Sequence, residues 1–348
     1  MDKIKESAIY KEDVESILKQ NCDWEKLKNK TILITGATGL IGTVLVDILV
    51  FLNARFNLNL HLILISRHEK KSDYDFIRYI AHDISEPLEF NEKIDYFIHA
   101  ASNTHPLQYS KFQIETIKTN VFGTYNLLNL ACKNPDSRFL LLSSVESYGD
   151  DFLNLEDGFS ENSAGYLDCN NPRSCYNESK RMSETLCASF LAEKGVDYVT
   201  ARICRSYGPT LKKDDSKAMS QFLRNAVHGE NIVLKSEGDQ YFSYIYSADA
   251  ASAIIFLLLN GKTGEAYNVA DEKSKITLKE LAQTIAEKAE TKVIFELPSE
   301  TEKKGYSKAV RSILNTQKIQ NLGWSAQYDI KSGIERTLKV FGKMGERK

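Results

Sequence analysis

The chain has 348 residues, with 45 Lys and Arg against 47 Asp and Glu, and a formal net charge of −2. This length suits one large α/β unit or two closely joined domains with a sizeable core. Because charges of both signs are mixed along the chain, the composition argues against a nucleic-acid partner or an anionic membrane surface. The most apolar stretch, residues 44–56, contains Asp47, Asn53 and Arg55 and is too short to span a bilayer.

The six cysteines lie at positions 22, 132, 169, 175, 187 and 204, without a CxxC pair or metal-ligand spacing. We therefore expect reduced thiols, no bound metal and a cytoplasmic location. The polar N-terminal segment MDKIKESAIYKEDV does not resemble a signal peptide.

Apolar positions at helical spacing predict an amphipathic helix within residues 10–28, in an N-terminal helical extension over 1–29. Strands and helices then alternate. The predicted strands are 31–35, 61–66, 96–102, 138–144 and 196–204. The predicted helices are 40–52, 112–133 and 176–194, followed by two more near 277–290 and 329–341.

This alternation predicts an α/β fold with a Rossmann-type doubly wound parallel sheet and helices on both faces. We expect a dinucleotide-binding Rossmann domain over residues 30–204, to which 243–270 also belongs. Residues 205–348 are expected to form mainly a smaller, mixed α/β substrate-binding domain.

The segment TGATGLIG (35–42) follows the first strand and opens a helix. Gly36 permits a tight turn, Gly39 lets the backbone approach a diphosphate, and Gly42 lets the helix pack on the strand. The diphosphate then lies at a helix N-terminus. Because both the strand and the helix are present, a dinucleotide site is favoured over an ordinary turn.

The second strand ends in ISRHEK, with Ser66 and Arg67 where an NAD-binding site usually offers a carboxylate. A hydroxyl and a guanidinium suit a 2′-phosphate, so NADP is favoured over NAD. The alternative is that Arg67 is a solvated surface residue and NAD binds. Asp83, after a predicted third strand, either contacts the adenine or caps a turn.

The segment YNESK (176–180) places Tyr176 and Lys180 one turn apart on a helix face. An ammonium beside a phenol favours the phenolate, so the tyrosine can act as a base near neutral pH. Such pairs are common, but this one accompanies the glycine pattern and the strand end SSVESYG (143–149).

TGATGLIG, HAAS (99–102), TNVFGT (119–124), SSVESYG and YNESK occur in the order found in the extended short-chain dehydrogenase/reductases. The chain resembles their nucleotide-sugar epimerase/dehydratase branch from about Lys30 to Trp324. The resemblance implies a bound nicotinamide dinucleotide that oxidises a sugar hydroxyl, usually at C4, to a ketone. The cofactor is often returned to its starting state in a later step.

By this resemblance Ser144, Tyr176 and Lys180 match the catalytic triad. Ser144 is chosen over Ser143 because the family serine or threonine lies four residues before the tyrosine of the YG pair, here Tyr148. Tyr176 then removes a proton from the sugar hydroxyl, Ser144 hydrogen-bonds the reacting oxygen, and Lys180 holds the ribose and stabilises the phenolate.

The residues expected to contact the dinucleotide are Gly36, Thr38, Gly39, Leu40, Ile41, Gly42, Ser66, Arg67, Asp83, Ile84, Ala100, Ala101, Ser102, Asn120, Tyr176 and Lys180. Among them, Asn120 matches a helix asparagine that is largely structural.

Glu146 bears on the subclass. The 4,6-dehydratases carry Asp-Glu after the catalytic Ser or Thr, the UDP-glucuronate decarboxylases carry Ser-Glu, and this chain has Val145-Glu146. Valine cannot give a proton to a leaving hydroxyl, which counts against a standard dehydratase. Decarboxylation or epimerisation remains, with Glu146 as the one catalytic carboxylate; alternatively Glu146 is a structural hydrogen-bond acceptor.

Residues 99–124 and 170–186 resemble decarboxylase segments, and Arg311 falls where those enzymes carry a functional arginine. Arg311 is expected to hold a carboxylate or, less specifically, a substrate diphosphate. Two departures concern the substrate. Arg205 stands where the family usually has asparagine, and Phe242 stands where relatives usually place an arginine near the phosphates. Either Arg205 supplies the missing phosphate-binding cation from another direction, or the substrate differs. Arg205 and Thr104 are expected to contact the substrate.

Epimerisation or related 4-keto chemistry on a nucleotide sugar is the favoured function. UDP-glucuronate-type decarboxylation comes second, and an NADPH-dependent reductase or a non-catalytic dinucleotide-binding sensor are further alternatives. Ile114, Ile117 and Val121 belong either to the core or to the four-helix homodimer interface that the family uses. By analogy, the setting is cell-surface polysaccharide synthesis.

Overall fold

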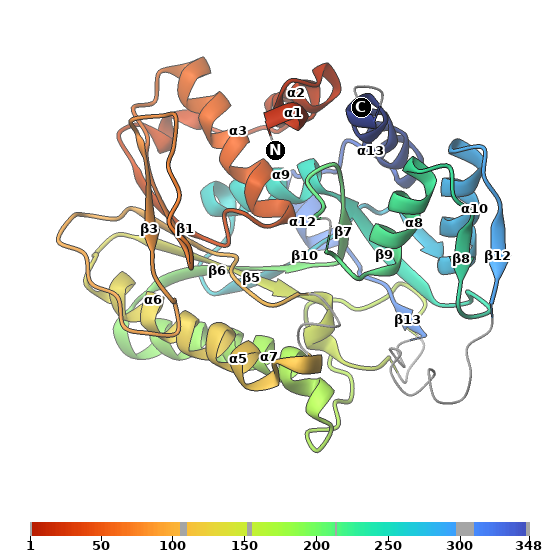
Figure 1. Cartoon of the computed structure of the whole chain (residues 1–348). Coiled ribbons are helices and arrows are strands. Elements are labelled where there is room, and N and C mark those ends of the chain that lie inside the picture. Colours follow the sequence, from red (N-terminus) through yellow and green to blue (C-terminus); the bar gives the residue numbers. More distant parts are fainter. Residues whose placement is uncertain (1, 105–109, 152–154, 213, 297–309, 346–348) are drawn as a thin grey trace.

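The computed structural model of the chain describes residues 2–104, 110–151, 155–212, 214–296 and 310–345 (Figure 1). At its centre lies a seven-stranded sheet of order β10-β6-β5-β4-β1-β2-β3, in which every neighbouring pair is parallel. The strands are β1 (Thr31–Thr35), β2 (His61–Ser66), β3 (Ile77–Ala81), β4 (Tyr96–His99), β5 (Arg138–Ser144), β6 (Asp197–Ile203) and β10 (Glu265–Val269). The predicted Rossmann-type doubly wound parallel sheet is confirmed.

Helices cover both faces of this sheet. They are α3 (Leu40–Phe56) and α9 (Ser247–Asn260) above it in Figure 1, and α5 (Gln113–Ile117), η3 (Lys118–Phe122), α6 (Gly123–Cys132) and α7 (Cys175–Lys194) below it. Successive β1 side chains point to opposite faces. Ile32 and Ile34 pack in the core that includes α3 and α9, whereas Leu33 packs with Leu127 of α6 and Cys187 of α7. Burial on both faces explains why the strands are almost wholly apolar.

One predicted boundary was wrong, and one predicted helix is present with an irregular turn. The strand predicted over 96–102 ends at His99. Beyond it, the Ala101 N–H donates to the side chain of Thr35 in β1 (3.1 Å) instead of to a backbone carbonyl of that strand. The helix predicted over 112–133 contains the π-helical turn η3. There the Asn120 carbonyl accepts from the hydroxyls of Thr124 (2.5 Å) and Ser183 (2.9 Å), so the helix is tied to α7 at this point.

A second, smaller group of strands lies beyond the carboxyl end of the large sheet. It comprises β7 (Arg205–Tyr207), β9 (Tyr241–Tyr246), β11 (Lys275–Thr277) and β13 (Arg311–Ser312), with the separate pair β8 (Ile232–Leu234) and β12 (Val293–Phe295). Four helices accompany it: α8 (Ala218–Val227), α10 (Leu278–Lys288), α12 (Gln317–Leu322) and α13 (Ile330–Gly345). Both helices predicted near 277–290 and 329–341 are present, as α10 and α13.

The amphipathic helix predicted within residues 10–28 is present, but it ends at Lys19, and the segment up to residue 28 is not one continuous helix. The segment forms α1 (Asp2–Lys5), α2 (Ala8–Glu15), η1 (Ser16–Lys19) and η2 (Trp24–Leu27). The polar stretch QNCD interrupts the helical run, because Asp23 turns its carboxylate back to accept from the Glu25 N–H (3.2 Å).

This N-terminal segment connects the two parts of the molecule. The Tyr10 hydroxyl donates to Asp47 of α3 (2.7 Å), and Arg336 of α13 donates to Asp13 (2.5 Å). Asp13 is 1% exposed and also accepts from the Tyr246 hydroxyl of β9 (2.6 Å). Hydrogen bonds from α2 therefore tie α3, α13 and β9 together.

Candidate active site

The turn between β1 and α3 can be built only with glycine at two positions. Gly36 has φ +74°, and a Cβ there would lie 2.6 Å from the Ala100 carbonyl carbon. A Cβ on Gly42 would lie 2.1 Å from the Gly36 oxygen. Gly39 is the N-cap of α3 and gives no side-chain cap. The first N–H groups of α3, where the helix dipole is positive, therefore have no capping side chain and suit a diphosphate.

The surroundings of this turn also fit a dinucleotide. Thr38, Leu40 and Ile41 are half-buried beside it, and the Thr210 hydroxyl fixes the Leu40 carbonyl (2.7 Å). The chain after β4 also borders the glycine turn, because the Ala100 backbone lies against Gly36. This segment contains Ala100, Ala101 and Ser102. The Ser102 hydroxyl is buried and has no partner among the described residues, so it is available to a bound group.

The end of β2 presents no carboxylate. The Ser66 hydroxyl donates to the His68 carbonyl (2.5 Å), and Arg67 is exposed. Asp83 caps a turn by accepting from the Ser85 N–H (2.9 Å) and hydroxyl (2.8 Å). These bonds, the backbone one first, hold the pKa of Asp83 below its usual value. Its neighbour Ile84 is buried, and its side chain lies against Gly123 of α6.

The two serines at the end of β5 face different partners. Ser143 donates to the Glu184 carboxylate of α7, inside the protein. Ser144 is the N-cap of η4 (Val145–Tyr148), and its hydroxyl accepts from the Glu146 N–H (3.2 Å). Only Ser143 is held by a side chain of the helix below, which is consistent with the choice of Ser144 for the reacting position.

Tyr176 and Lys180 lie in the first turns of α7, beside the end of β5. The Lys180 ammonium donates to the Leu142 carbonyl (2.7 Å) and lies 5.9 Å from the centre of the Tyr176 ring. Complete burial lowers the pKa of Lys180 to about 8, and the Glu184 carboxylate opposes that shift. Asn120 donates to the Ser179 hydroxyl of the same helix (2.8 Å), so it links η3 to α7.

Glu146 lies in an ion pair. Its carboxylate accepts from the Arg205 guanidinium of β7 (3.2 Å), and Asn177 donates both to this carboxylate (3.3 Å) and to the Glu146 backbone carbonyl (2.9 Å). The preceding Val145 is buried and only 2% exposed. The Glu146 carboxylate, bound by Arg205 and Asn177, thus lies two residues along the chain from Ser144.

Three residues beside Glu146 and Arg205 were not predicted as site residues: Phe242, Lys217 and Asn177. The Arg205 guanidinium stacks on the Phe242 ring, with 3.5 Å between Cζ and the ring centroid. Lys217, the N-cap of α8, interacts electrostatically with both Arg205 and Glu146, and burial lowers its pKa. Lys217 could not have been found from a motif, because it lies in a loop without regular spacing. Asn177 could have been, because it is part of YNESK.

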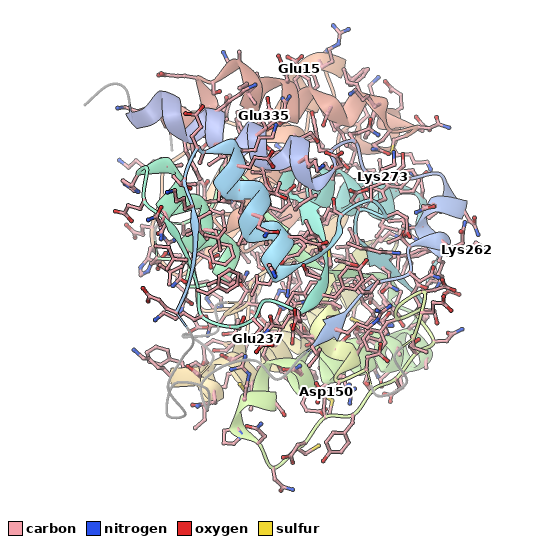
Figure 2. All side chains as sticks on the ribbon, turned by 90° about the vertical axis from the view of Figure 1, so that its right-hand side faces the viewer. Glu15, Asp150, Glu237, Lys262, Lys273 and Glu335 are labelled. Carbon is pink, nitrogen blue, oxygen red and sulfur yellow. The ribbon has the colours of Figure 1, made fainter. Side chains whose placement is uncertain are left out.

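Arg311 is bound to a different loop. Its guanidinium donates to the carbonyls of Leu155 (3.0 Å) and Glu156 (2.8 Å) and lies 3.9 Å from the Asp151 carboxylate. A hollow of about 260 Å³ lies here, with Asp150, labelled in Figure 2, among its lining residues. Thr104 is exposed at the end of a described range, before residues 105–109, which lie outside the described part of the chain.

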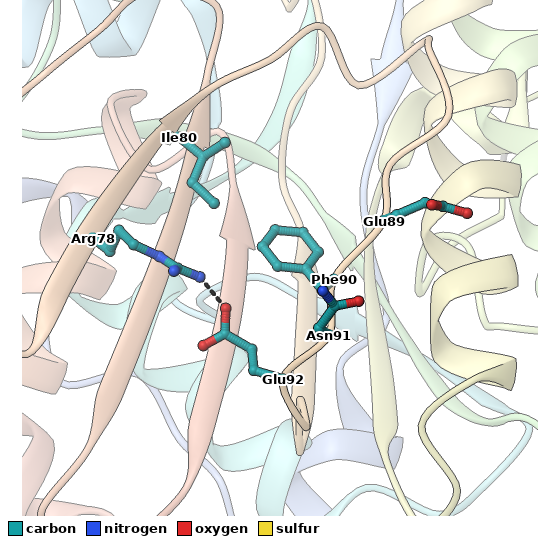
Figure 3. A pocket seen from close by; sticks show the side chains of 6 residues that line it. All are labelled: Arg78, Ile80, Glu89, Phe90, Asn91 and Glu92. Carbon is teal, nitrogen blue, oxygen red and sulfur yellow. Dashed lines mark hydrogen bonds and ion pairs between the residues drawn. The ribbon is translucent and has the colours of Figure 1, made fainter.

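A larger hollow of about 540 Å³ lies elsewhere, over the edge strand β3 (Figure 3). Ile80 and Phe90 face it, and Arg78 pairs with Glu92 at its side. Three strands in the sheet order, β4, β1 and β2, separate β3 from β5 and Ser144, so this hollow does not belong to the site.

Within the described ranges, no group of His, Cys, Asp and Glu could hold a metal ion, and no helix is both long and apolar enough to cross a membrane. The six cysteines are all free thiols. The chemistry that the site offers is therefore that of Ser144, Tyr176, Lys180 and Glu146, beside a glycine turn suited to a dinucleotide.

The parallel sheet, the glycine turn and the Ser/Tyr/Lys grouping define a dinucleotide-dependent enzyme of the short-chain dehydrogenase/reductase type. The model of the NAD dependent epimerase/dehydratase family matches residues 32–270, and the chain belongs to this family.

Curated relatives support the assignment over most of the chain. UDP-glucuronic acid decarboxylase 6 of Arabidopsis thaliana is 31% identical over 325 residues, which cover 88% of this chain and 87% of the relative. UDP-glucuronic acid decarboxylase 1 of Xenopus tropicalis is 29% identical over 319 residues, covering 90% and 72%.

Solved structures support the fold. The UDP-glucose 4-epimerase of Thermotoga maritima, with UDP-glucose, superposes with a TM-score of 0.76 at 19% identity, covering 90% of this chain and 99% of that one. The dTDP-glucose 4,6-dehydratase DesIV of Streptomyces venezuelae, with NAD bound, has a TM-score of 0.75 at 22% identity, covering 90% and 97%.

Proposed function

We propose that this enzyme is a nucleotide-sugar epimerase that works through a 4-keto intermediate. The observation that carries the proposal is the meeting of the β5 end with the first turns of α7, where the Lys180 ammonium lies 2.7 Å from the Leu142 carbonyl and beside the Tyr176 ring. The dinucleotide, bound at the glycine turn, supplies the hydride acceptor. Tyr176 takes the proton of the sugar hydroxyl, Ser144 donates a hydrogen bond to that oxygen, and Lys180 stabilises the phenolate.

Glu146 and Val145 support epimerisation over dehydration. Loss of water needs an acid for the leaving hydroxyl as well as a base. Val145 is buried and apolar, and the Glu146 carboxylate is paired with the Arg205 guanidinium. A single carboxylate is enough for 4-keto chemistry in which no group leaves the sugar.

Decarboxylation of a UDP-glucuronate-type substrate is the second candidate. Two observations favour it. The curated relatives described above are UDP-glucuronic acid decarboxylases, and Glu146 is retained beside a guanidinium, here that of Arg205. Loss of a C5 carboxylate from a 4-keto sugar needs no acid for a leaving hydroxyl, so Val145 is compatible with it.

For the cofactor, we propose NADP rather than NAD. The support is the end of β2, where Ser66 and the exposed Arg67 replace a ribose-binding carboxylate and where Asp83 is already committed to Ser85. The family is NAD dependent and DesIV binds NAD, which makes a direct measurement decisive. Equilibrium dialysis of NAD and NADP should give the tighter binding for NADP, and Arg67→Gln should abolish the difference.

We also propose a homodimer. Ile114 is 70% exposed on α5, Ile117 41%, and Met182 on α7 50%, and the exposed Phe122 of η3 and Tyr125 of α6 follow α5 in the chain. These side chains form an apolar surface that a second copy of the chain would cover. Light scattering should give the dimer mass, and Ile114→Lys with Met182→Lys should give the monomer mass.

The domain organisation and the cellular location are also part of the proposal. Residues 30–204 with 243–270 form the dinucleotide-binding domain, residues 205–348 form mainly the substrate domain, and residues 1–29 form a helical extension. A cytoplasmic location and a role in polysaccharide synthesis are proposed from the free thiols and from the family.

The deciding experiment incubates the purified protein with UDP-, dTDP-, CDP- and GDP-sugars and follows the products by mass spectrometry. A mass-neutral change without net use of cofactor supports epimerisation. Release of carbon dioxide selects the decarboxylase, and net consumption of NADPH selects a reductase. Firm dinucleotide binding with no turnover of any sugar would contradict the enzymatic proposal and favour a non-catalytic sensor.

A further inference from the structure

Three charged side chains from separate parts of the sequence meet beside the end of β5. Glu146 comes from η4, Arg205 from β7 and Lys217 from the start of α8. Arg205 donates to the Glu146 carboxylate (3.2 Å), and Lys217 interacts with both. The buried Asp215 carboxylate also acts on Lys217, so two cations and two anions lie together here.

Arg205 is held in a fixed orientation. In the β7–β9 pairing it lies opposite Tyr244, which places Phe242 two residues away on the same face of β9. Its guanidinium lies flat on the Phe242 ring at 3.5 Å, and one nitrogen, Nη2, is used by Glu146. The other terminal nitrogen, Nη1, is buried and has no hydrogen-bond partner among the described residues.

A buried guanidinium N–H without an acceptor is costly, and an added oxyanion would relieve that cost. Lys217 would contribute a second cation, and no hydrogen bond of its ammonium is found in the described part of the chain. The Phe242 ring keeps the guanidinium plane from turning away.

We propose that Arg205 Nη1 and Lys217 together bind one oxyanion of the substrate and so act as specificity-determining residues. This inference rests on the proposed function and names the class of substrate, a nucleotide sugar whose oxyanion reaches the side of Glu146. The oxyanion is either a carboxylate on the sugar or a phosphate of the diphosphate. Because Glu146 is two residues from Ser144, the sugar carboxylate fits this position better.

The test measures binding rather than turnover. Isothermal titration of the dinucleotide-loaded protein with UDP-glucuronate, UDP-glucose and UDP is carried out on the wild type, Arg205→Asn and Lys217→Gln. Lys235→Gln, which removes an exposed lysine of the same part of the molecule, is the matched control for lost charge. Thermal unfolding and dinucleotide binding verify that each variant is folded.

We expect Arg205→Asn and Lys217→Gln to weaken UDP-glucuronate binding roughly 10- to 100-fold, with Lys235→Gln unchanged. If the oxyanion is the sugar carboxylate, the affinities for UDP-glucose and UDP stay the same. If it is a phosphate, all three ligands weaken equally. If the folded variants bind all three ligands as the wild type does, the oxyanion inference is overturned, but the proposed function is not. A wild type that binds none of these or of the dTDP-, CDP- and GDP-sugars would overturn the proposed function with it.

Discussion

The Arg205 guanidinium stacks on the ring of Phe242 with a distance of 3.5 Å between its Cζ and the ring centroid. By the family resemblance described above, an arginine is usual at the position of Phe242 and an asparagine at that of Arg205. The chain therefore presents its cation from β7 and uses the neighbouring strand β9 as the surface on which the cation rests. The pairing of Arg205 with Glu146 follows from this arrangement.

Replacing the Phe242 ring should make the position of the Arg205 guanidinium less fixed without removing its charge. Phe242→Leu keeps an apolar side chain of similar burial but abolishes the cation–π contact, which is worth about 1 kcal/mol at a partly exposed site. We expect the KM for the nucleotide sugar to rise roughly 3- to 10-fold with little change in thermal stability. Steady-state kinetics measure this. An unchanged KM would mean that Arg205 is held by Glu146 alone.

Ser144→Ala and Ser143→Ala form a matched pair of adjacent hydroxyl deletions. Loss of a hydrogen bond to the reacting oxygen should lower kcat roughly 100- to 1,000-fold in Ser144→Ala, with wild-type stability. Ser143 bonds Glu184 instead, so Ser143→Ala should keep kcat within about tenfold and lose about 1 kcal/mol of unfolding free energy. Reversed effects on kcat would show that Ser143 is the reacting serine.

The fall of kcat at alkaline pH should reflect the deprotonation of Lys180. Burial lowers the pKa of this lysine to about 8, so its ammonium is lost as the pH rises through that value, and kcat should fall above it. The Glu184 carboxylate raises this pKa, so Glu184→Gln should move the falling limb to lower pH. A pH series of kcat measures both. A limb that stays in place in Glu184→Gln would contradict this coupling, because loss of stability alone does not shift a pKa.

Deprotonation of Lys180 should change stability and activity in opposite directions: as the pH rises, kcat falls while the unfolding free energy increases. Because the pKa of Lys180 in the folded protein lies below the ordinary lysine value of 10.5, the buried ammonium destabilises the fold fully below about pH 8. That cost fades between pH 8 and 10.5. Lys180→Met should therefore raise the unfolding free energy by roughly 2 kcal/mol at pH 7, and by progressively less toward pH 10. Urea unfolding at both pH values checks this, and a lower stability at pH 7 would contradict it.

Asp13 and Glu12 offer a matched comparison in the N-terminal segment. Both contact Arg336, but Asp13 is buried and also accepts from Tyr246, whereas the Glu12 side chain is 63% exposed. Removing one partner of a buried pair leaves the other uncompensated, so Asp13→Ala should cost about 3 kcal/mol. Glu12→Ala should cost less than about 0.5 kcal/mol. Equal losses in urea unfolding would mean that the segment does not tie α3, α13 and β9 together.

Local sequence was sufficient for the large sheet and for the main motifs. TILIT, HLILIS and RFLLLSS are apolar runs that can be buried only as central parallel strands, and they match β1, β2 and β5 residue by residue. Gly36 and Gly42 had to be glycine because any Cβ there meets backbone atoms. In these places the signal lies within a few neighbouring residues, which is why the Rossmann-type fold could be predicted from sequence.

The smaller strands and the N-terminal segment depended on contacts that are distant in sequence. The strands β7, β11 and β13 have two or three residues each and exist because β9 lies beside them. The break after η1 depends on Asp23, whose carboxylate accepts from the nearby Glu25 N–H instead of leaving the helix to continue.

The sequence by itself determined the sheet, the glycine turn and the positions of Ser144, Tyr176 and Lys180, since each is encoded by short-range spacing. Only the tertiary structure decided which side chains surround Glu146. Arg205, Lys217 and Phe242 are between 59 and 96 residues away along the chain, and no periodic pattern relates them. They meet because β7 and β9 pair and α8 begins beside them, and the charge of the site is set by that meeting.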